Sequence, residues 1–155
     1  MQTMTCNDTG KRGLKFLVVD DDQTIRKIMQ IQLKIFGLRV DVAHDGVQAV
    51  QLVLGCRYDV IFMDIQMPNM NGILAAETIR SHELEHGHAP AYIIATTAGG
   101  ATPEQCFDAG MNDYLMKPVG FTKVVDVLYQ LLFERHSRDK FERELPKCGC
   151  CTSCI

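Results

Sequence analysis

The chain has 155 residues, 46% of them hydrophobic, and a formal net charge of −3. This length suits one domain, and a domain of this size buries about two-thirds of the surface that its unfolded chain exposes. No apolar stretch approaches the ~18 residues that a membrane span needs, and the polar N-terminus lacks a signal-peptide core, so we expect neither feature. No basic stripe stands out, so we do not expect nucleic acid as a partner.

Composition divides the chain into three segments. We expect a flexible N-terminal arm over 1–13, a structured domain over 14–136 and a charged, cysteine-rich tail over 137–155. An odd number of cysteines without a secretory signal indicates free thiols in a reducing compartment, so we expect a cytoplasmic or also nuclear protein. The tail could bind a thiophilic metal, carry a lipid or remain reduced through its four cysteines, Cys148, Cys150, Cys151 and Cys154.

Short apolar runs alternate with amphipathic stretches along the predicted domain. The runs are about strand length and are typical of buried strands; they cover 16–19, 39–43, 60–63, 92–96 and 113–116. Helical spacing of apolar residues, with N-cap and glycine stop signals, predicts helices over about 25–36, 47–54, 73–83, 103–109 and 121–132. This alternation predicts an α/β fold with a parallel sheet and helices on both of its faces.

Polar residues follow four of the five apolar runs, where parallel strands end at a common edge and ligands bind. These residues are Asp20, Asp21 and Asp22, then Asp64, then Thr97, then Lys117. Three carboxylates about 4 Å apart repel by about 4 kcal/mol per pair at an effective dielectric of about 20. Such a cluster therefore takes up a proton or a cation, and oxygen ligands favour Mg²⁺.

A metal beside Asp64 makes this carboxylate a plausible nucleophile towards phosphorus, with an aspartyl phosphate as the product. The transferred group carries negative charge on three oxygens. Mg²⁺, the ammonium of Lys117 and the hydroxyl of Thr97 could each hold one of them.

Four segments resemble the receiver domain of two-component response regulators, in the same order and over nearly the whole predicted domain. They are FLVVDDDQTIRKIM (16–29), YDVIFMDIQMPNMNG (58–72), IIATTAGG (93–100) and DAGMNDYLMKPV (108–119). The resemblance implies a flavodoxin-like (βα)5 three-layer sandwich, with a five-stranded parallel sheet in the order 2-1-3-4-5.

The resemblance also implies individual roles for the residues at the strand ends. Asp64 becomes the phosphoacceptor and also a metal ligand. Asp21 contacts Mg²⁺ directly, Asp20 mostly through water, and Gln66 through its backbone carbonyl.

Three further residues follow from the same resemblance. Thr97 is the switch hydroxyl, and Lys117 pairs with the phosphoryl oxygens and precedes a cis proline, Pro118. Tyr114 is the aromatic ring that rotates when Thr97 moves inwards. Gly99 and Gln66 depart from the pattern of bacterial receivers at two positions that flank the water route to the phosphoryl group, which leaves the lifetime of the phosphorylated state open.

We therefore expect a phosphorelay receiver that takes a phosphoryl group from a histidine-containing phosphotransfer protein or a histidine kinase. Its only catalysis would be its own phosphorylation and dephosphorylation, and we expect a monomer. It is similar to short plant receivers without an output domain, sometimes called type C, although a piece of a hybrid histidine kinase would look alike. The donor is expected to dock around the first helix, near Ile25, Ile28 and Met29.

An alternative from another class uses some of the same residues. Asp20-x-Asp22-x-Thr24 after an apolar strand matches the nucleophile motif of haloacid-dehalogenase-type phosphatases. That family needs a further acidic motif late in the chain, which this sequence lacks. The phosphatase interpretation also leaves Asp64 without a role. Asp22 is expected to cap the first helix.

Overall fold

A computed structural model describes residues 13–144 of the chain, with side chains for 13–131 and for Phe133. The first twelve residues of the predicted arm and the four cysteines of the predicted tail lie outside the described residues. The chain divides into two compact units, residues 1–119 and 120–155, and each is considered by itself.

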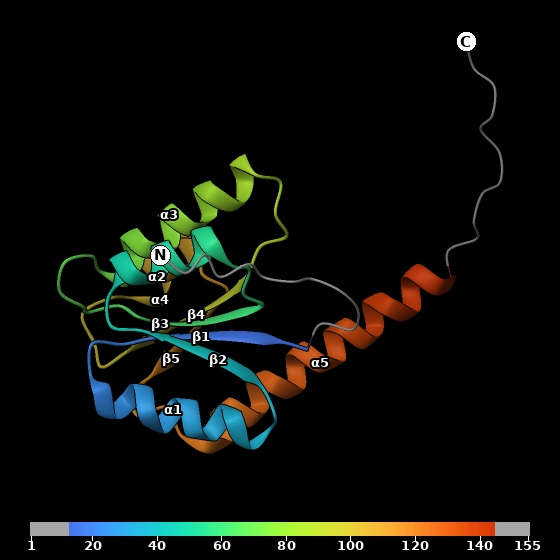
Figure 1. Cartoon of the computed structure of the whole chain (residues 1–155), viewed down its shortest axis with the longest axis horizontal. Coiled ribbons are helices and arrows are strands. Elements are labelled where there is room, and N and C mark those ends of the chain that lie inside the picture. Colours follow the sequence, from blue (N-terminus) through green and yellow to red (C-terminus); the bar gives the residue numbers. More distant parts are fainter. Residues whose placement is uncertain (1–12, 145–155) are drawn as a thin grey trace, which may run out of the picture. The chain divides into compact units, whose positions relative to one another are not determined.

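The first unit is built on a five-stranded parallel sheet (Figure 1). Its strands are β1 Lys15–Val19, β2 Arg39–Ala43, β3 Val60–Asp64, β4 Tyr92–Thr97 and β5 Asp113–Met116. The strand order is β2-β1-β3-β4-β5, and all four pairings are parallel. The predicted fold class and strand order are confirmed.

Four helices belong to the first unit, and their bounds lie close to the predicted ones. They are α1 Gln23–Ile35, α2 Gly46–Gly55, α3 Gly72–Glu85 and α4 Pro103–Asp108. In Figure 1, α1 lies against one face of the sheet, and α2 and α3 lie against the opposite face. The sheet is therefore covered on both sides, which explains the continuous apolar runs of its central strands β1 and β3.

The main core lies between the sheet and the helices α2 and α3. Inward-facing residues of the central strands, such as Leu17 and Ile61, pack with the small and branched residues Ala75, Ala76 and Ile79 of α3. The alternate residues Phe16 and Phe62 are equally buried, as expected where successive strand side chains point to opposite covered faces. The central strands β1 and β3 are apolar from Phe16 and Val60 up to their carboxyl ends, so the aspartates that follow or close them gather at that edge of the sheet.

Two predicted helix starts are confirmed by their hydrogen bonds. Asp22 caps α1 by accepting bonds from the backbone N–H groups of Thr24 and Ile25. Thr102 caps α4 in a reciprocal capping box with Gln105. Each cap ends the short loop that follows a strand, β1 for Asp22 and β4 for Thr102, so the first turns of α1 and α4 lie at the carboxyl edge of the sheet.

The second unit contains α5, which spans Phe121–Glu144. The apolar spacing had predicted a helix end near residue 132, so the observed helix is longer than expected. Residues 133–144 lack apolar periodicity, but they contain neither glycine nor proline and are rich in Glu, Arg and Lys. Such residues have high helix propensity, so the helix continues beyond its apolar stripe.

Candidate functional site

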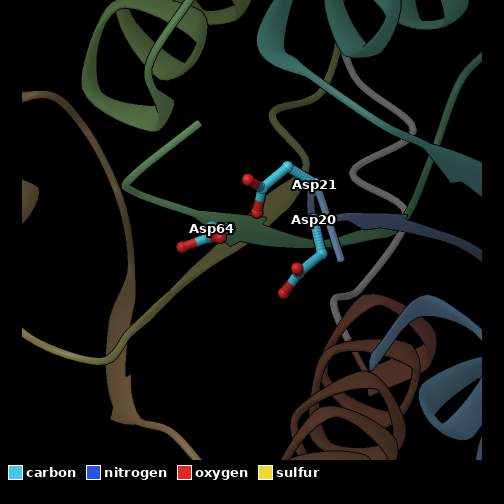
Figure 2. Close-up of side chains that lie close together, drawn as sticks. All are labelled: Asp20, Asp21 and Asp64. Atoms are coloured by element: carbon cyan, nitrogen blue, oxygen red, sulfur yellow. The ribbon is translucent and has the colours of Figure 1, made fainter. Parts of the chain in front are cut away.

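Three carboxylates meet at the carboxyl edge of the sheet (Figure 2). Asp20 and Asp21 follow β1, and Asp64 is the last residue of the neighbouring strand β3. One oxygen from each carboxylate lies within 4.8 Å of the others. Asp20 and Asp64 are buried, whereas Asp21 is exposed. Two carboxylates of the cluster are therefore enclosed by protein, and one faces solvent.

Lys117, the first residue after β5, pairs with both buried carboxylates. Its Nζ lies 2.7 Å from Oδ2 of Asp20 and 2.8 Å from Oδ2 of Asp64. The peptide bond from Lys117 to Pro118 is cis, as predicted. The ammonium offsets only one of the three negative charges, so the site keeps an excess of negative charge.

Burial sets the protonation behaviour of this pair. Desolvation raises the pKa of Asp64 above its ordinary value, and neither the hydrogen bond nor the charge of Lys117 fully offsets it. Burial opposes the charged form of Lys117, yet its hydrogen bonds to Asp20 and Asp64 outweigh that effect and raise its pKa. Lys117 is therefore a permanent cation at neutral pH.

Backbone groups hold the two buried carboxylates in fixed orientations. The N–H of Asp22 donates to Oδ1 of Asp20 at 2.9 Å, and the N–H of Gln66 donates to Oδ1 of Asp64 at 3.2 Å. Arg26 on α1 donates to the backbone carbonyl of Asp20 at 2.6 Å. In each carboxylate one oxygen is thus held by a backbone N–H and the other by Lys117.

The donor set fits a divalent cation. Every ligand available from Asp20, Asp21 and Asp64 is a carboxylate oxygen, which hard cations such as Mg²⁺ and Ca²⁺ prefer. A bound cation would also offset the negative charge that Lys117 leaves over.

Thr97 and Tyr114 are both tied to the loop between β4 and α4. The hydroxyl of Thr97 is buried, donates to the carbonyl of Gly99 at 2.6 Å and accepts from its N–H at 3.0 Å. The hydroxyl of Tyr114 donates to the carbonyl of Ala101, in the same loop, at 3.3 Å. A change in this loop would therefore be felt by both side chains.

An open cleft of about 610 Å³ lies beside the carboxylates, between the β3–α3 loop and α4. Asp21, Gln66 and Ala101 are among the residues that line it. The side-chain amide of Gln66 lies so close to Gly100 that a Cβ at Gly100 would overlap it. Gln66 thus borders both the carboxylates and the β4–α4 loop.

Sequence reasoning gave no role to Gly72, the first residue of α3. A Cβ at this position would overlap the carbonyl oxygen of Asp64, and its N–H donates to the carbonyl of Ile65 at 3.0 Å. Gly72 therefore allows α3 to begin directly against the end of β3. The available signal was the glycine that ends the run MPNMNG after Asp64.

The structure does not favour the phosphatase interpretation. Asp20 shares its site with Asp21 and Asp64, whereas the carboxylate of Asp22 caps α1. Asp64, which that interpretation leaves unused, lies at the centre of the site.

No helix in the described part of the chain combines the length and apolarity that a membrane crossing requires.

Comparison with protein-family models gives one match, the response regulator receiver domain, over residues 16–129. Hybrid signal transduction histidine kinase B of Dictyostelium discoideum is 37% identical over 128 residues, which cover 76% of this chain. The chain spans only 6% of that kinase. Two-component response regulator 24 of Arabidopsis thaliana is 36% identical over 121 residues, which cover 77% of this chain and 85% of the relative.

The solved structures that are similar in fold and sequence include two receivers. One is the Saccharomyces cerevisiae receiver domain of Ssk1, crystallised with the histidine phosphotransfer protein Ypd1, at 30% identity and a TM-score of 0.69. The match covers 73% of this chain and 84% of that one. The other is the receiver domain of a Pseudomonas aeruginosa sensor histidine kinase with Mg²⁺ in its active-site cleft, at 35% identity and a TM-score of 0.67, covering 77% and 97%. The chain belongs to the response regulator receiver domain family.

Proposed function

We propose that this chain is a phosphorelay receiver that accepts a phosphoryl group from a phosphohistidine onto Asp64. One observation carries the proposal: Lys117 bridges Asp64 and Asp20 at the sheet edge, with Asp21 beside them. This arrangement supplies a nucleophile, a fixed cation and further oxygen ligands at one place. Hydrolysis of the product would return the site to its starting state.

The transfer is a displacement at phosphorus. An oxygen of Asp64 forms the new P–O bond while the P–N bond of the phosphohistidine breaks, and the electron pair of that bond returns to the imidazole of the donor. Lys117, already beside Asp64, stabilises the negative charge on the transferred group. In hydrolysis, water attacks the phosphorus and Asp64 leaves as a carboxylate.

We propose Mg²⁺ as the metal of this site. Asp20, Asp21 and Asp64 would hold it with their carboxylates and Gln66 with its backbone carbonyl. When bound, Mg²⁺ would neutralise charge that develops on the phosphoryl oxygens. The related Pseudomonas aeruginosa receiver holds Mg²⁺ in its active-site cleft, and the oxygen-rich cluster here suits the same ion.

The same site suggests a conformational switch. A phosphoryl group on Asp64 adds about −1.5 to −2 charges, which would draw the hydroxyl of Thr97 away from Gly99. Release of that bond would free the β4–α4 loop, to which Tyr114 is also bonded. Exchange broadening of the Tyr114 ring signals on addition of a phosphoryl mimic would support the switch, and unchanged ring dynamics would contradict it.

We propose a histidine-containing phosphotransfer protein, or the matching domain of a histidine kinase, as the donor. The related Ssk1 receiver was crystallised with such a protein. On α1, Ile28 and Ile31 expose 49% and 61% of their surface, so they can contact a partner. The prediction that Met29 takes part is wrong, because Met29 is buried. Such a donor would place the chain in the cytoplasm or nucleus.

A small phosphodonor tests the proposal without the natural partner. The protein is incubated with phosphoramidate, with and without Mg²⁺, and its intact mass is followed over time. We expect one added phosphoryl group in the presence of Mg²⁺, none in Asp64→Asn, and normal labelling in the matched control Asp22→Asn. Folded protein that gains no phosphoryl group would refute the proposal, and the decay of the label would measure the lifetime of the phosphorylated state.

A further inference from the structure

Three histidines gather at the carboxyl end of α3, away from the aspartates. The ring centroids of His82 and His86 are 4.2 Å apart, and those of His82 and His88, and of His86 and His88, are 5.6 Å and 5.7 Å apart. Helix α3 begins against Asp64 and has 14 residues. At about 1.5 Å per residue, this places the histidines roughly 20 Å from the phosphoacceptor.

Local structure brings the three rings together. His82 and His86 are four residues apart, so they lie on the same face of the helix. Gly87 then adopts a left-handed conformation with a φ of 61°, which turns the chain back. The N–H of His88 donates to the carbonyl of Glu83 at 2.8 Å, and this bond holds the backbone of His88 beside the end of α3.

Two of the imidazoles have a nitrogen in a state suited to metal binding. Nε2 of His82 is buried and has no hydrogen-bond partner. Nδ1 of His86 lies 2.9 Å from the carbonyl oxygen of His82, so Nδ1 is the donor, and in the neutral imidazole Nε2 carries the lone pair. A backbone carbonyl that orients the second nitrogen is the usual outer-shell partner of a metal-binding histidine.

We propose that His82, His86 and His88 form a binding site for Zn²⁺. Three imidazoles with Zn–N bonds of about 2.0–2.1 Å around a tetrahedral ion have ring centroids about 5 Å apart, near the spacing found here. Among the described residues only the three aspartates have ligand atoms that all lie within 4.8 Å, so the rings must rotate to reach one ion. His86 is exposed and His88 partly exposed, which permits this rotation.

The site would bind the metal without hydrolysing a substrate. His82, Glu83 and His86 match H-E-x-x-H, in which the glutamate of zinc peptidases acts as a general base. Here Glu83 is buried, accepts a bond from the N–H of Ala91 at 2.8 Å and pairs with Arg80 at 2.6 Å. Its oxygens are already used, so a bound ion would clamp the end of α3 to the turn that carries His88.

Zinc titration of the full chain tests this site. The four tail cysteines are replaced by serine in all samples, since thiolates would also bind Zn²⁺, and excess Mg²⁺ occupies the aspartates. Calorimetry should show one Zn²⁺ per chain, with an affinity at least tenfold weaker in His86→Asn and in His88→Asn. His44→Asn, which removes an exposed histidine outside the cluster, should bind as the parent does.

Further readouts separate Zn²⁺ binding at the histidines from the proposed phosphorylation of Asp64. Bound Co²⁺ should give the visible absorption of a tetrahedral site with nitrogen ligands, and saturating Zn²⁺ should raise the Tm of the parent but not of the His86→Asn, His88→Asn double variant. Asp64→Asn should retain Zn²⁺ binding even though it cannot be phosphorylated. Absence of binding, or binding that survives the double variant, would overturn the proposal.

Discussion

The ammonium of Lys117 lies 2.8 Å from the carboxylate of Asp64, the residue that we propose as nucleophile. The same nitrogen lies 2.7 Å from Asp20, so in this state one cation serves two carboxylates. A divalent ion bound by Asp20 and Asp64 would share these two carboxylates with the lysine. Lys117 therefore opposes the metal electrostatically while it assists the phosphoryl group.

Replacement of Lys117 by glutamine should separate these two effects. The rate of phosphorylation should fall by about 10²-fold, because one fixed donor to the developing charge is lost. Mg²⁺ affinity should stay the same or increase, because a competing cation has been removed. The matched control is Lys34→Gln, which removes an exposed lysine of α1. Loss of Mg²⁺ affinity together with the rate would contradict the assigned role of Lys117.

Burial of Asp64 should make the native protein less stable than its Asn variant at neutral pH. Because burial raises the pKa of Asp64, the native state binds this proton more tightly than the unfolded state does. The free energy of unfolding therefore falls as pH rises from the ordinary carboxyl pKa, about 3.9, through the raised native pKa. The Asp64→Asn variant has no carboxyl group at this position, so its free energy of unfolding should not show this fall with rising pH.

Thermal unfolding in metal-free buffer measures the effect. The Tm of Asp64→Asn should exceed that of the parent at pH 7, where about 1 kcal/mol corresponds to about 2–8 °C for domains of this size range. The difference in Tm between Asp64→Asn and the parent should become smaller as the pH falls towards 4. A gap that does not change with pH, or a parent that is more stable at pH 7, would show that Lys117 fully compensates for the burial.

Gly72→Ala should destabilise the fold and impair the site together. Its Cβ would overlap the carbonyl oxygen of Asp64, so α3 and the end of β3 must move apart. Overpacking of this kind costs about 1–3 kcal/mol, measurable by urea unfolding. Gly55→Ala, whose Cβ would meet no atom within 4 Å, should be neutral. Equal effects at both positions would refute the close approach of α3 to Asp64.

Asp22 should matter for stability but not for chemistry. Asp22→Ala removes the cap of α1 and should lower the Tm. Asp22→Asn keeps an oxygen acceptor for the backbone N–H groups, so its Tm should stay close to that of the parent. Both variants should be phosphorylated within twofold of the parent rate. A strong loss of phosphorylation in Asp22→Asn would contradict this expectation and would favour a phosphatase-like role for Asp20 and Asp22.

The sequence predicted the elements that depend on local pattern. Strand ends were found because buried runs stop at polar residues such as Asp64, and the cap at Asp22 followed from its position before an amphipathic stretch. The end of α5 was missed because 133–144 show no apolar periodicity, although their composition favours helix. Apolar periodicity predicts a helix only where one face of it is apolar, and 133–144 lack that pattern.

Other features depend on tertiary geometry. That Lys117 would pair with Asp20 as well as Asp64 depends on how β1, β3 and β5 place their ends in space. The sequence also could not show that Met29 is buried while Ile28 is exposed, since both lie on the apolar side of α1. Nor could it show that the hydroxyl of Thr97 is bonded to Gly99.

Chemical mapping of the phosphorylated residue would show whether Asp64 is the phosphoacceptor. The protein is phosphorylated with phosphoramidate and Mg²⁺, reduced with borohydride, which converts an aspartyl phosphate to homoserine, and digested for mass spectrometry. We expect conversion at Asp64 alone, and none without Mg²⁺. Conversion at Asp20 or Asp21, or none in folded and metal-loaded protein, would contradict it.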